Sequence, residues 1–198
     1  MTAHSLKSRL LVIGTIVLII ALGLTGLGLT FLFNRHVERR INAELDTYLA
    51  QLASRLSFDE TGRPHLGGKL ADPRFEKIYG GLYWQVNNET AGLSARSRSL
   101  WDTRLKLPVD IPDFGNVHAH NTIGPQDSML LVHERRLRFK TPAGEQIARV
   151  IVAIDRSELD KMSSDFATDV AIALLVLCAF LLMAGWVQIT IGLGPFSQ

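Results

Sequence analysis

The sequence has only one cysteine, Cys178, and almost no excess of charge of either sign. A single cysteine excludes an intrachain disulfide, so cysteine usage indicates neither an oxidising nor a reducing compartment. The formal net charge is +2 in 198 residues, which gives no electrostatic basis for binding nucleic acid. The sequence also lacks internal repeats and low-complexity tracts. Hydrophobic residues, in contrast, make up 47% of the chain.

Much of this hydrophobicity lies in two long stretches without charged residues. The first covers residues 10–34, between Arg9 and Arg35, and the second begins after Asp169. A helix rises about 1.5 Å per residue, so roughly 24 residues reach about 36 Å. That length exceeds the ~30 Å hydrocarbon core of a bilayer. The sequence therefore predicts two transmembrane helices, residues 10–34 and 169–192, with the lipid bilayer as a partner.

The first stretch is expected to be an uncleaved anchor rather than a signal peptide. It is longer than a typical signal-peptide core, and no Ala-x-Ala-like cleavage motif follows it. Its flanking charges do not fix its orientation, because Lys7 and Arg9 precede it while Arg35, Arg39 and Arg40 follow it. A simple count would place the centre of the chain inside the cell, but long loops translocate largely regardless of charge.

The roughly 135 residues between the two spans are enough for one small domain with its own core. Residues 35–168 are assigned to this domain. Residues 1–9 form an N-terminal segment, and residues 193–198 follow the second span.

An amphipathic helix is expected to continue from the first span, because no proline or glycine occurs between Asn34 and Asp59. Apolar residues recur there at steps of three or four, which is one face of a helix: Val37, Ile41, Leu45, Tyr48, Leu52 and Leu56. This stripe either packs on its own domain or forms part of a dimer interface, and both can hold along different segments.

The remainder of the domain has the pattern of an antiparallel sheet. Glycine, proline and charge indicate a loop at residues 59–74. Alternating or β-branched runs then predict two hairpins, formed by residues 81–86 with 93–101 and by 128–139 with 147–154. In the run 128–139, one face is expected to carry Leu130 and Val132, and the other Leu131, Leu137 and Phe139. A helix is expected to start at Asp155 or Ser157 and to lead into the second span. The predicted fold class is α+β, with a long N-terminal helix and a central antiparallel sheet.

Five residues of the first hairpin are candidates for ligand binding. Tyr83, Trp84 and Trp101 can line a pocket, although aromatic strands more often fill a core. Arg96 and Arg98 are expected on one face of a strand, where guanidinium groups can bind an anion. Alternatively, both arginines are charged residues on the exposed face of the strand and bind no ligand.

Three histidines provide a possible metal site. His118 and His120 are two residues apart in a predicted loop, and His133 follows later. On a strand, residues two apart share a face and can bind a metal together. Zinc sites usually need three or four ligands, and no cysteine is available here. We therefore expect no metal site and no cofactor in this chain.

Three runs of sequence together resemble the sensing half of a bacterial two-component sensor histidine kinase. DPRF at 72–75, GLYWQ at 81–85 and RSRSLWD at 96–102 form the first. VAIDRSEL at 152–159 is similar to a last strand that enters the second membrane helix. GLGPF at 192–196 is similar to the start of a HAMP linker, in which a proline follows the membrane helix.

This resemblance implies a periplasmic PAS-like (PDC-like) sensor domain in a homodimer at the bacterial inner membrane. It also implies that residues 1–9 are cytoplasmic and that residues 193–198 are the truncated start of the HAMP linker. It also implies signal transduction through Asp155, Leu159, Met162 and Pro195 to a cytoplasmic HAMP and kinase region. In that family the kinase takes part in a phosphorelay with a cognate response regulator and uses ATP and magnesium. Both cofactors are implied only for the kinase region, which this chain lacks.

The chain itself departs from a kinase. His133-Glu134 resembles the start of a phosphoacceptor box, but Arg138 stands where the box has proline. We expect no catalytic residue here, because phosphoryl transfer needs a nucleotide cradle and metal ligands. Two alternatives remain open: the front end of a chemoreceptor or cyclic-dinucleotide enzyme, and a non-signalling two-span scaffold protein.

Overall fold

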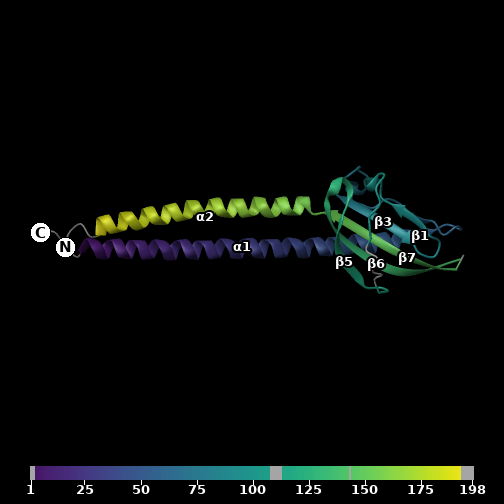
Figure 1. Cartoon of the computed structure of the whole chain (residues 1–198), viewed down its shortest axis with the longest axis horizontal. Helices are drawn as coiled ribbons and strands as arrows, with labels where there is room; N and C mark the ends of the chain where they lie inside the picture. The colour runs from purple at the N-terminus through teal and green to yellow at the C-terminus, as the bar shows by residue number, and fades with distance from the viewer. Residues whose placement is uncertain (1–2, 108–112, 143, 193–198) are drawn as a thin grey trace. The chain divides into compact units, whose positions relative to one another are not determined.

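The structure, a computed structural model, describes residues 3–107, 113–142 and 144–192 (Figure 1). It divides into two units. The helical unit contains residues 3–36 and 161–192, and the folded domain contains residues 37–160. The domain is therefore slightly shorter at both ends than the predicted range of 35–168.

Two helices are long and apolar enough to cross a membrane. They are α1, Ala3–Arg55, and α2, Ser157–Gly192. The most apolar window of each is wholly unburied, and these windows lie within Val12–Arg55 and Leu159–Gln188. A helix satisfies its own backbone hydrogen bonds, so such side chains can face lipid without an unpaired backbone group. Both predicted spans therefore coincide with observed helices.

Two contacts pack α1 against α2 inside the helical unit. The rings of Phe33 and Phe166 stack with their centroids 4.0 Å apart. Gly26 lies so close to α2 that a Cβ added there would be 2.7 Å from Leu174 Cδ1. A glycine allows this approach because it has no side chain, as small residues do in other membrane helix pairs.

Helix α1 continues without a break from the apolar stretch into the domain, as predicted, but it ends at Arg55 rather than near Asp59. Leu56–Phe58 forms strand β1, which pairs antiparallel with β2, Pro64–Leu66. The prediction of a loop over 59–74 was therefore wrong at β2 and at the short 3-10 helix η1, Pro73–Phe75.

The chemistry of the turn explains why β1 and β2 form. The Asp59 carboxylate accepts hydrogen bonds from the backbone N–H groups of Thr61 and Arg63. Gly62 has φ of 79°, a conformation that glycine adopts without steric cost. Together they close a tight turn between the two short strands.

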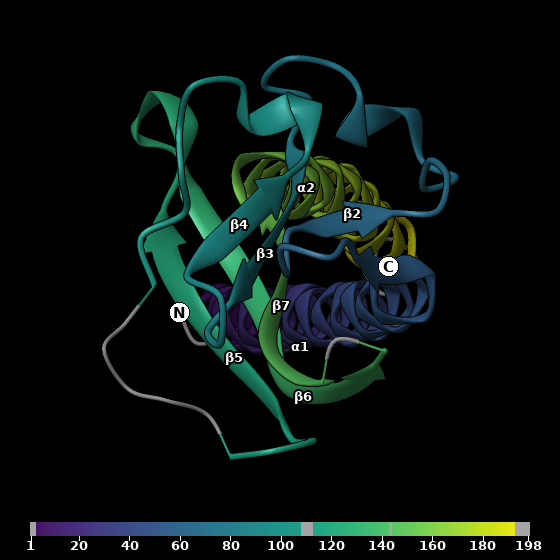
Figure 2. The same ribbon diagram turned by 90° about the vertical axis from the view of Figure 1, so that its right-hand side faces the viewer.

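A five-stranded antiparallel sheet forms the centre of the domain (Figure 2). Its spatial order is β4 (Leu93–Arg96), β3 (Leu82–Asn88), β7 (Gly144–Asp155), β6 (Met129–Thr141) and β5 (Val117–Ile123). Both predicted hairpins are present, β3 with β4 and β6 with β7. The edge strand β5 was not predicted, and η3, Pro125–Asp127, connects it to β6.

The first hairpin is shorter than predicted on one side. Strand β4 ends at Arg96, and η2, Arg98–Leu100, follows it. The Ser97 N–H donates to the Trp84 carbonyl and the Ser97 hydroxyl accepts a hydrogen bond from the Trp84 N–H, after which the backbone enters η2. Arg96 and Arg98 therefore do not lie on one face of a strand, and that prediction was wrong.

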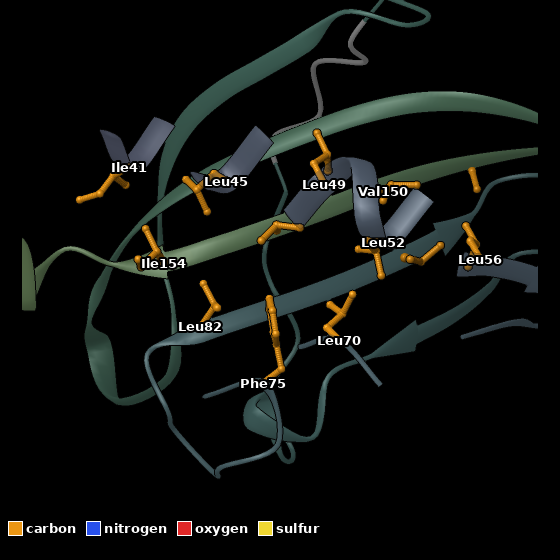
Figure 3. Close-up of a cluster of buried hydrophobic side chains, with 13 residues drawn as sticks. Ile41, Leu45, Leu49, Leu52, Leu56, Leu70, Phe75, Leu82, Val150 and Ile154 are labelled. Carbon is orange, nitrogen blue, oxygen red and sulfur yellow. The ribbon is translucent and has the colours of Figure 1, made fainter. Parts of the chain in front are cut away.

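The main core lies between α1 and one face of the sheet (Figure 3). Leu45, Leu49 and Leu52 of α1 are at most 1% exposed and point toward Val150 of β7 and Leu82 of β3. This confirms that the predicted apolar stripe packs on its own domain. Leu49 belongs to it as well, although the sequence-based stripe omitted this residue.

A smaller core covers part of the opposite face of the sheet. It joins side chains of β3, β6 and β7 to the segment that follows η2: Tyr83, Leu100, Leu105, Leu130, Val132, Ile151 and Ala153. The predicted division of β6 is confirmed, because Leu130 and Val132 lie in this core while Leu131 packs against the main core.

A polar network anchors η1 to α1 beside the main core. Arg74 Nη2 lies 2.8 Å from Asp72 Oδ2 and 3.2 Å from Glu44 Oε1. The Tyr48 hydroxyl also donates to Asp72 Oδ2 at 2.9 Å. The hydrogen bonds from Arg74 lower the pKa of Asp72 to about 2, whereas burial raises the pKa of Tyr48 to about 12.

Asp72 should make the stability of the domain depend on pH in acid. Its folded pKa of about 2 lies below the unfolded value of about 3.9. The stabilisation is therefore complete above about pH 4 and is lost as pH falls through about 2. Asp72→Asn should lower the free energy of unfolding by about 1–2 kcal/mol at neutral pH. The difference from the wild type should disappear near pH 2, as measured by denaturant titration.

Tyr48→Phe is the matched control for this prediction. It removes one hydrogen bond to Asp72 but keeps Arg74, the main cause of the lowered pKa. The difference in free energy of unfolding between Tyr48→Phe and Asp72→Asn should therefore still shrink as the pH falls. A difference between wild type and Asp72→Asn that stays constant between pH 5 and pH 2 would contradict the assignment.

Gly26→Val should destabilise the helix pair, because the new side chain would collide with Leu174. We expect a loss of about 1–3 kcal/mol in unfolding by SDS in mixed micelles, followed by circular dichroism. Gly28→Val is the control, since a Cβ at Gly28 meets nothing within 4 Å. Equal losses in both variants would mean that helix propensity, rather than interhelical packing, decides the result.

Candidate functional site

Two histidines point to the same face of the edge strand β5. His118 and His120 are two residues apart, and side chains of a strand alternate between its faces. Val117, which precedes His118 in the strand, points to the other face and packs against the main core on the α1 side of the sheet. The histidines therefore lie on the opposite face, which the smaller core partly covers. Sequence reasoning had placed them in a loop.

The register of β5 on β6 brings Glu134 to these histidines. His118 is directly opposite Glu134, and its Nδ1 lies 3.2 Å from Glu134 Oε1. His120 Nδ1 lies 3.8 Å from the same oxygen. One possible ligand atom from each residue lies within 4.8 Å of the others. Two imidazoles and one carboxylate thus converge on one point.

Glu134 also forms a buried ion pair with Arg149 of β7. Arg149 Nε donates to Glu134 Oε2 at 2.7 Å, and Arg149 Nη2 donates to Oε1 at 2.8 Å. The Glu134 side chain has no solvent exposure, and Arg149 is 8% exposed. Two parallel hydrogen bonds of this kind are the bidentate geometry in which arginine binds a carboxylate.

His120 is the unusual member of this cluster. Neither ring nitrogen is exposed to solvent, and neither has a hydrogen-bond partner among the described residues. Burial lowers the pKa of His120, so the neutral imidazole is favoured. A neutral imidazole offers a free lone pair, which is the form that binds metal ions.

His133 takes no part in the cluster, because it points to the other face of β6. Its Nδ1 is 2.8 Å from Asp46 Oδ1, and its Nε2 is 2.9 Å from Asn42 Oδ1. Both partners belong to α1, so His133 attaches the helix to the sheet. These two contacts explain why His133 is buried, and they require no catalytic or metal-binding role for it.

The aromatic ligand candidates do not share a pocket wall. Tyr83 is buried in the smaller core, whereas Trp84 packs against the main core on the opposite face. Trp101 is 55% exposed and has a positive φ of 50°. Neighbouring strand residues point to opposite faces, so these rings cannot surround one ligand.

The two candidate arginines are exposed and lie in different elements, β4 and η2. Arg96 Nη1 donates to the backbone carbonyl of Thr103 at 3.2 Å, so it fastens a neighbouring loop. The structure therefore does not bring Arg96 and Arg98 together with the aromatic candidates into one site.

Three of the four residues predicted to transmit a signal lie at the junction between β7 and α2. The Asp155 carboxylate accepts a hydrogen bond from the Ser157 N–H at 2.8 Å and so caps α2. Leu159 packs against the main core, and Met162 is 60% exposed. Pro195 lies outside the described residues.

Comparison with known proteins assigns no family. No family model, curated protein or solved structure matches the chain. The cluster itself can therefore be interpreted only from its own geometry.

Sequence reasoning found the two histidines but not their partners. Glu134 was considered only beside His133, and Arg149 was not singled out. One signal was present: Glu134 follows Val132 by two residues on a strand, so it had to share the face of Val132. The pairing with β5 and β7 was not visible, because it depends on contacts between distant segments.

Arg149→Met should strongly destabilise the domain, because it removes both arginine hydrogen bonds from the buried Glu134 carboxylate. We expect a loss of about 3–5 kcal/mol in the free energy of unfolding. The double variant Arg149→Met/Glu134→Leu should recover most of this loss, since both buried charges are then absent. Denaturant titration monitored by tryptophan fluorescence measures both effects.

Lys69→Met is the control for a surface ion pair. Lys69 and Glu76 lie 3.2 Å apart, but their side chains are 76% and 39% exposed. Its cost should be about 0–1 kcal/mol. A similar small cost for Arg149→Met would show that the Glu134–Arg149 pair is not buried as described.

Proposed function

We propose that this chain is the sensing and transmembrane portion of a two-component sensor histidine kinase in the bacterial inner membrane. One observation carries the proposal: a single α+β domain begins on one apolar helix and ends on another. A domain attached to a membrane at both ends is suited to report its state to that membrane. In this proposal the domain is periplasmic and PAS-like.

The attachment of both helices to the domain core supports the proposal. Ile41 and Leu45 of α1 are buried in the main core, and Leu159, in the first turn of α2, packs against the same core. Packed interiors respond to change by discrete rearrangement rather than by continuous deformation. A rearrangement of the domain core therefore displaces the start of α2.

The cap at Asp155 makes this coupling direct. Strand β7 ends at Asp155 and α2 begins at Ser157, so only Arg156 separates them. The Asp155 N–H also donates to the Gly81 carbonyl at the start of β3. Movement of β7 relative to β3 would thus reach Leu159 and Met162 without an intervening flexible linker, and then Pro195 of the proposed HAMP linker.

The energy needed for such a switch is modest. A stimulus can shift the equilibrium only by its difference in affinity for the two states. A change from 1:99 to 99:1 requires about 5.5 kcal/mol. In the proposed homodimer, α2 would pass this bias to the HAMP linker and the kinase. The kinase would use ATP and magnesium to phosphorylate a histidine and then a response regulator.

A labelling experiment tests the proposed orientation. With Cys178 replaced by serine, the chain has no cysteine, so Lys69→Cys and Ser5→Cys each provide a single thiol. Lys69 is highly exposed in the domain, and Ser5 precedes the first span. In spheroplasts, a membrane-impermeant maleimide should modify Lys69→Cys at once. Ser5→Cys should react only after the membrane is permeabilised.

The reverse labelling pattern would reject a periplasmic domain and the receptor proposal with it. Permeabilised spheroplasts give the control, because both thiols should then react fully. The kinase assignment has its own test in the reading frame downstream of Gln198, which should encode a HAMP linker, a phosphoacceptor helix and an ATP-binding domain. A methyl-accepting or cyclic-dinucleotide output domain in that frame would reject the kinase.

A further inference from the structure

We propose that His118, His120 and Glu134 bind one divalent transition-metal ion of the zinc, nickel and copper type. The inference concerns the folded domain alone and holds whether or not the chain precedes a kinase. It reverses the sequence-based expectation that this chain has no metal site. That expectation considered three histidines, two of them in a predicted loop, and rested on the lack of a cysteine and of further ligands.

The type of ligand selects the type of metal. Imidazole nitrogen suits zinc, copper and nickel, whereas magnesium and calcium prefer sites built from oxygen alone. Two histidines and one glutamate also form the ligand set of several open zinc sites, in which a water molecule takes the fourth position. The fourth position here would be filled by water or a small anion.

The distances are close to those that a bound ion needs. Metal–ligand bonds of about 2.1 Å in a tetrahedral site separate the ligand atoms by about 3.4 Å. The separation of His118 Nδ1 and Glu134 Oε1 is 3.2 Å, and that of His120 Nδ1 and Glu134 Oε1 is 3.8 Å. All three ligand atoms lie within 4.8 Å of one another, so rotation of the histidine side chains would have to bring them closer around an ion.

The state of His120 favours a metal ligand over a structural histidine. A histidine buried for packing normally has a hydrogen-bond partner, as His133 has with Asp46 and Asn42. His120 has no such partner among the described residues, although both of its ring nitrogens are shielded from water. A hydrogen bond from His118 to Glu134 would explain His118 without a metal, but it leaves His120 unexplained.

Arg149 can remain bound to Glu134 while the metal is present. Arg149 Nε donates to Oε2 at 2.7 Å, and Arg149 Nη2 donates to Oε1 at 2.8 Å, the oxygen that also lies beside the histidines. Each carboxylate oxygen has two lone pairs, so Oε1 can accept this hydrogen bond and still bind an ion. Hydrogen bonds of this kind orient the ligating carboxylates of metal sites. The charge of Arg149 also repels a cation, so the affinity should be moderate rather than extreme.

A bound ion would fasten the edge strand to the sheet. His118 and His120 belong to β5, and Glu134 belongs to β6. An ion that binds the folded state in preference to the unfolded state stabilises the folded state by mass action. The thermal midpoint of the domain should therefore rise with the concentration of zinc.

The test uses the whole 198-residue chain in lipid nanodiscs, with Cys178→Ser and an affinity tag that contains no histidine. Isothermal titration with zinc should give one ion per chain. His118→Gln and His120→Gln should each weaken binding by at least about 10-fold to 100-fold. His65→Gln is the matched control, because His65 is exposed on β2, and it should bind as the parent does.

Two further measurements separate the proposed site from adventitious binding. Electron paramagnetic resonance of the copper-loaded chain should show two nitrogen ligands, and one should disappear in each variant. Magnesium should not compete with zinc. His118→Gln keeps the test decisive if His120→Gln fails to fold, since the His118 side chain is 42% exposed. No zinc binding, or equal zinc binding in His118→Gln and His65→Gln, would overturn the proposal.

Discussion

The packing of α1 leucines against one face of the sheet is the contact on which the rest of the domain depends. Leu45, Leu49 and Leu52 each bury nearly all of their side chains, and each contributes roughly 1.5–3 kcal/mol. This contact decides which face of β3 and β7 packs against α1. It also leaves the opposite face of β5 and β6 free to carry polar side chains, and it holds His133 against Asp46 and Asn42.

The charged cluster follows from that division of faces. Once Val132 and Leu130 lie in the smaller core, Glu134 must point the same way, where Arg149 and the β5 histidines meet it. A buried carboxylate without a partner would be costly, and the bidentate arginine removes that cost. The two histidines add ligand atoms beside a carboxylate that Arg149 already holds in place.

The helices give this domain its proposed context. Both α1 and α2 begin or end in the main core, and each contains an apolar stretch long enough to span a bilayer. A receptor needs a domain with at least two packings and a stiff connection to the membrane. Val37 and Leu159, near the two ends of the domain, both pack against its core.

The sequence alone determined the two apolar helices, the continuous helix after Asn34, both hairpins and the faces of β6, because periodicity of apolar residues is a local signal. It could not determine that β1 and β5 are strands, since short strands exist only through their pairing with distant segments. The cluster around His118 could not be predicted for the same reason. The sequence shows two histidines two residues apart, but only the register of β5 on β6 brings Glu134 to them. Local periodicity of apolar residues determines which segments are helices or strands and which side chains share a face. Tertiary contacts decide which side chains of distant segments meet.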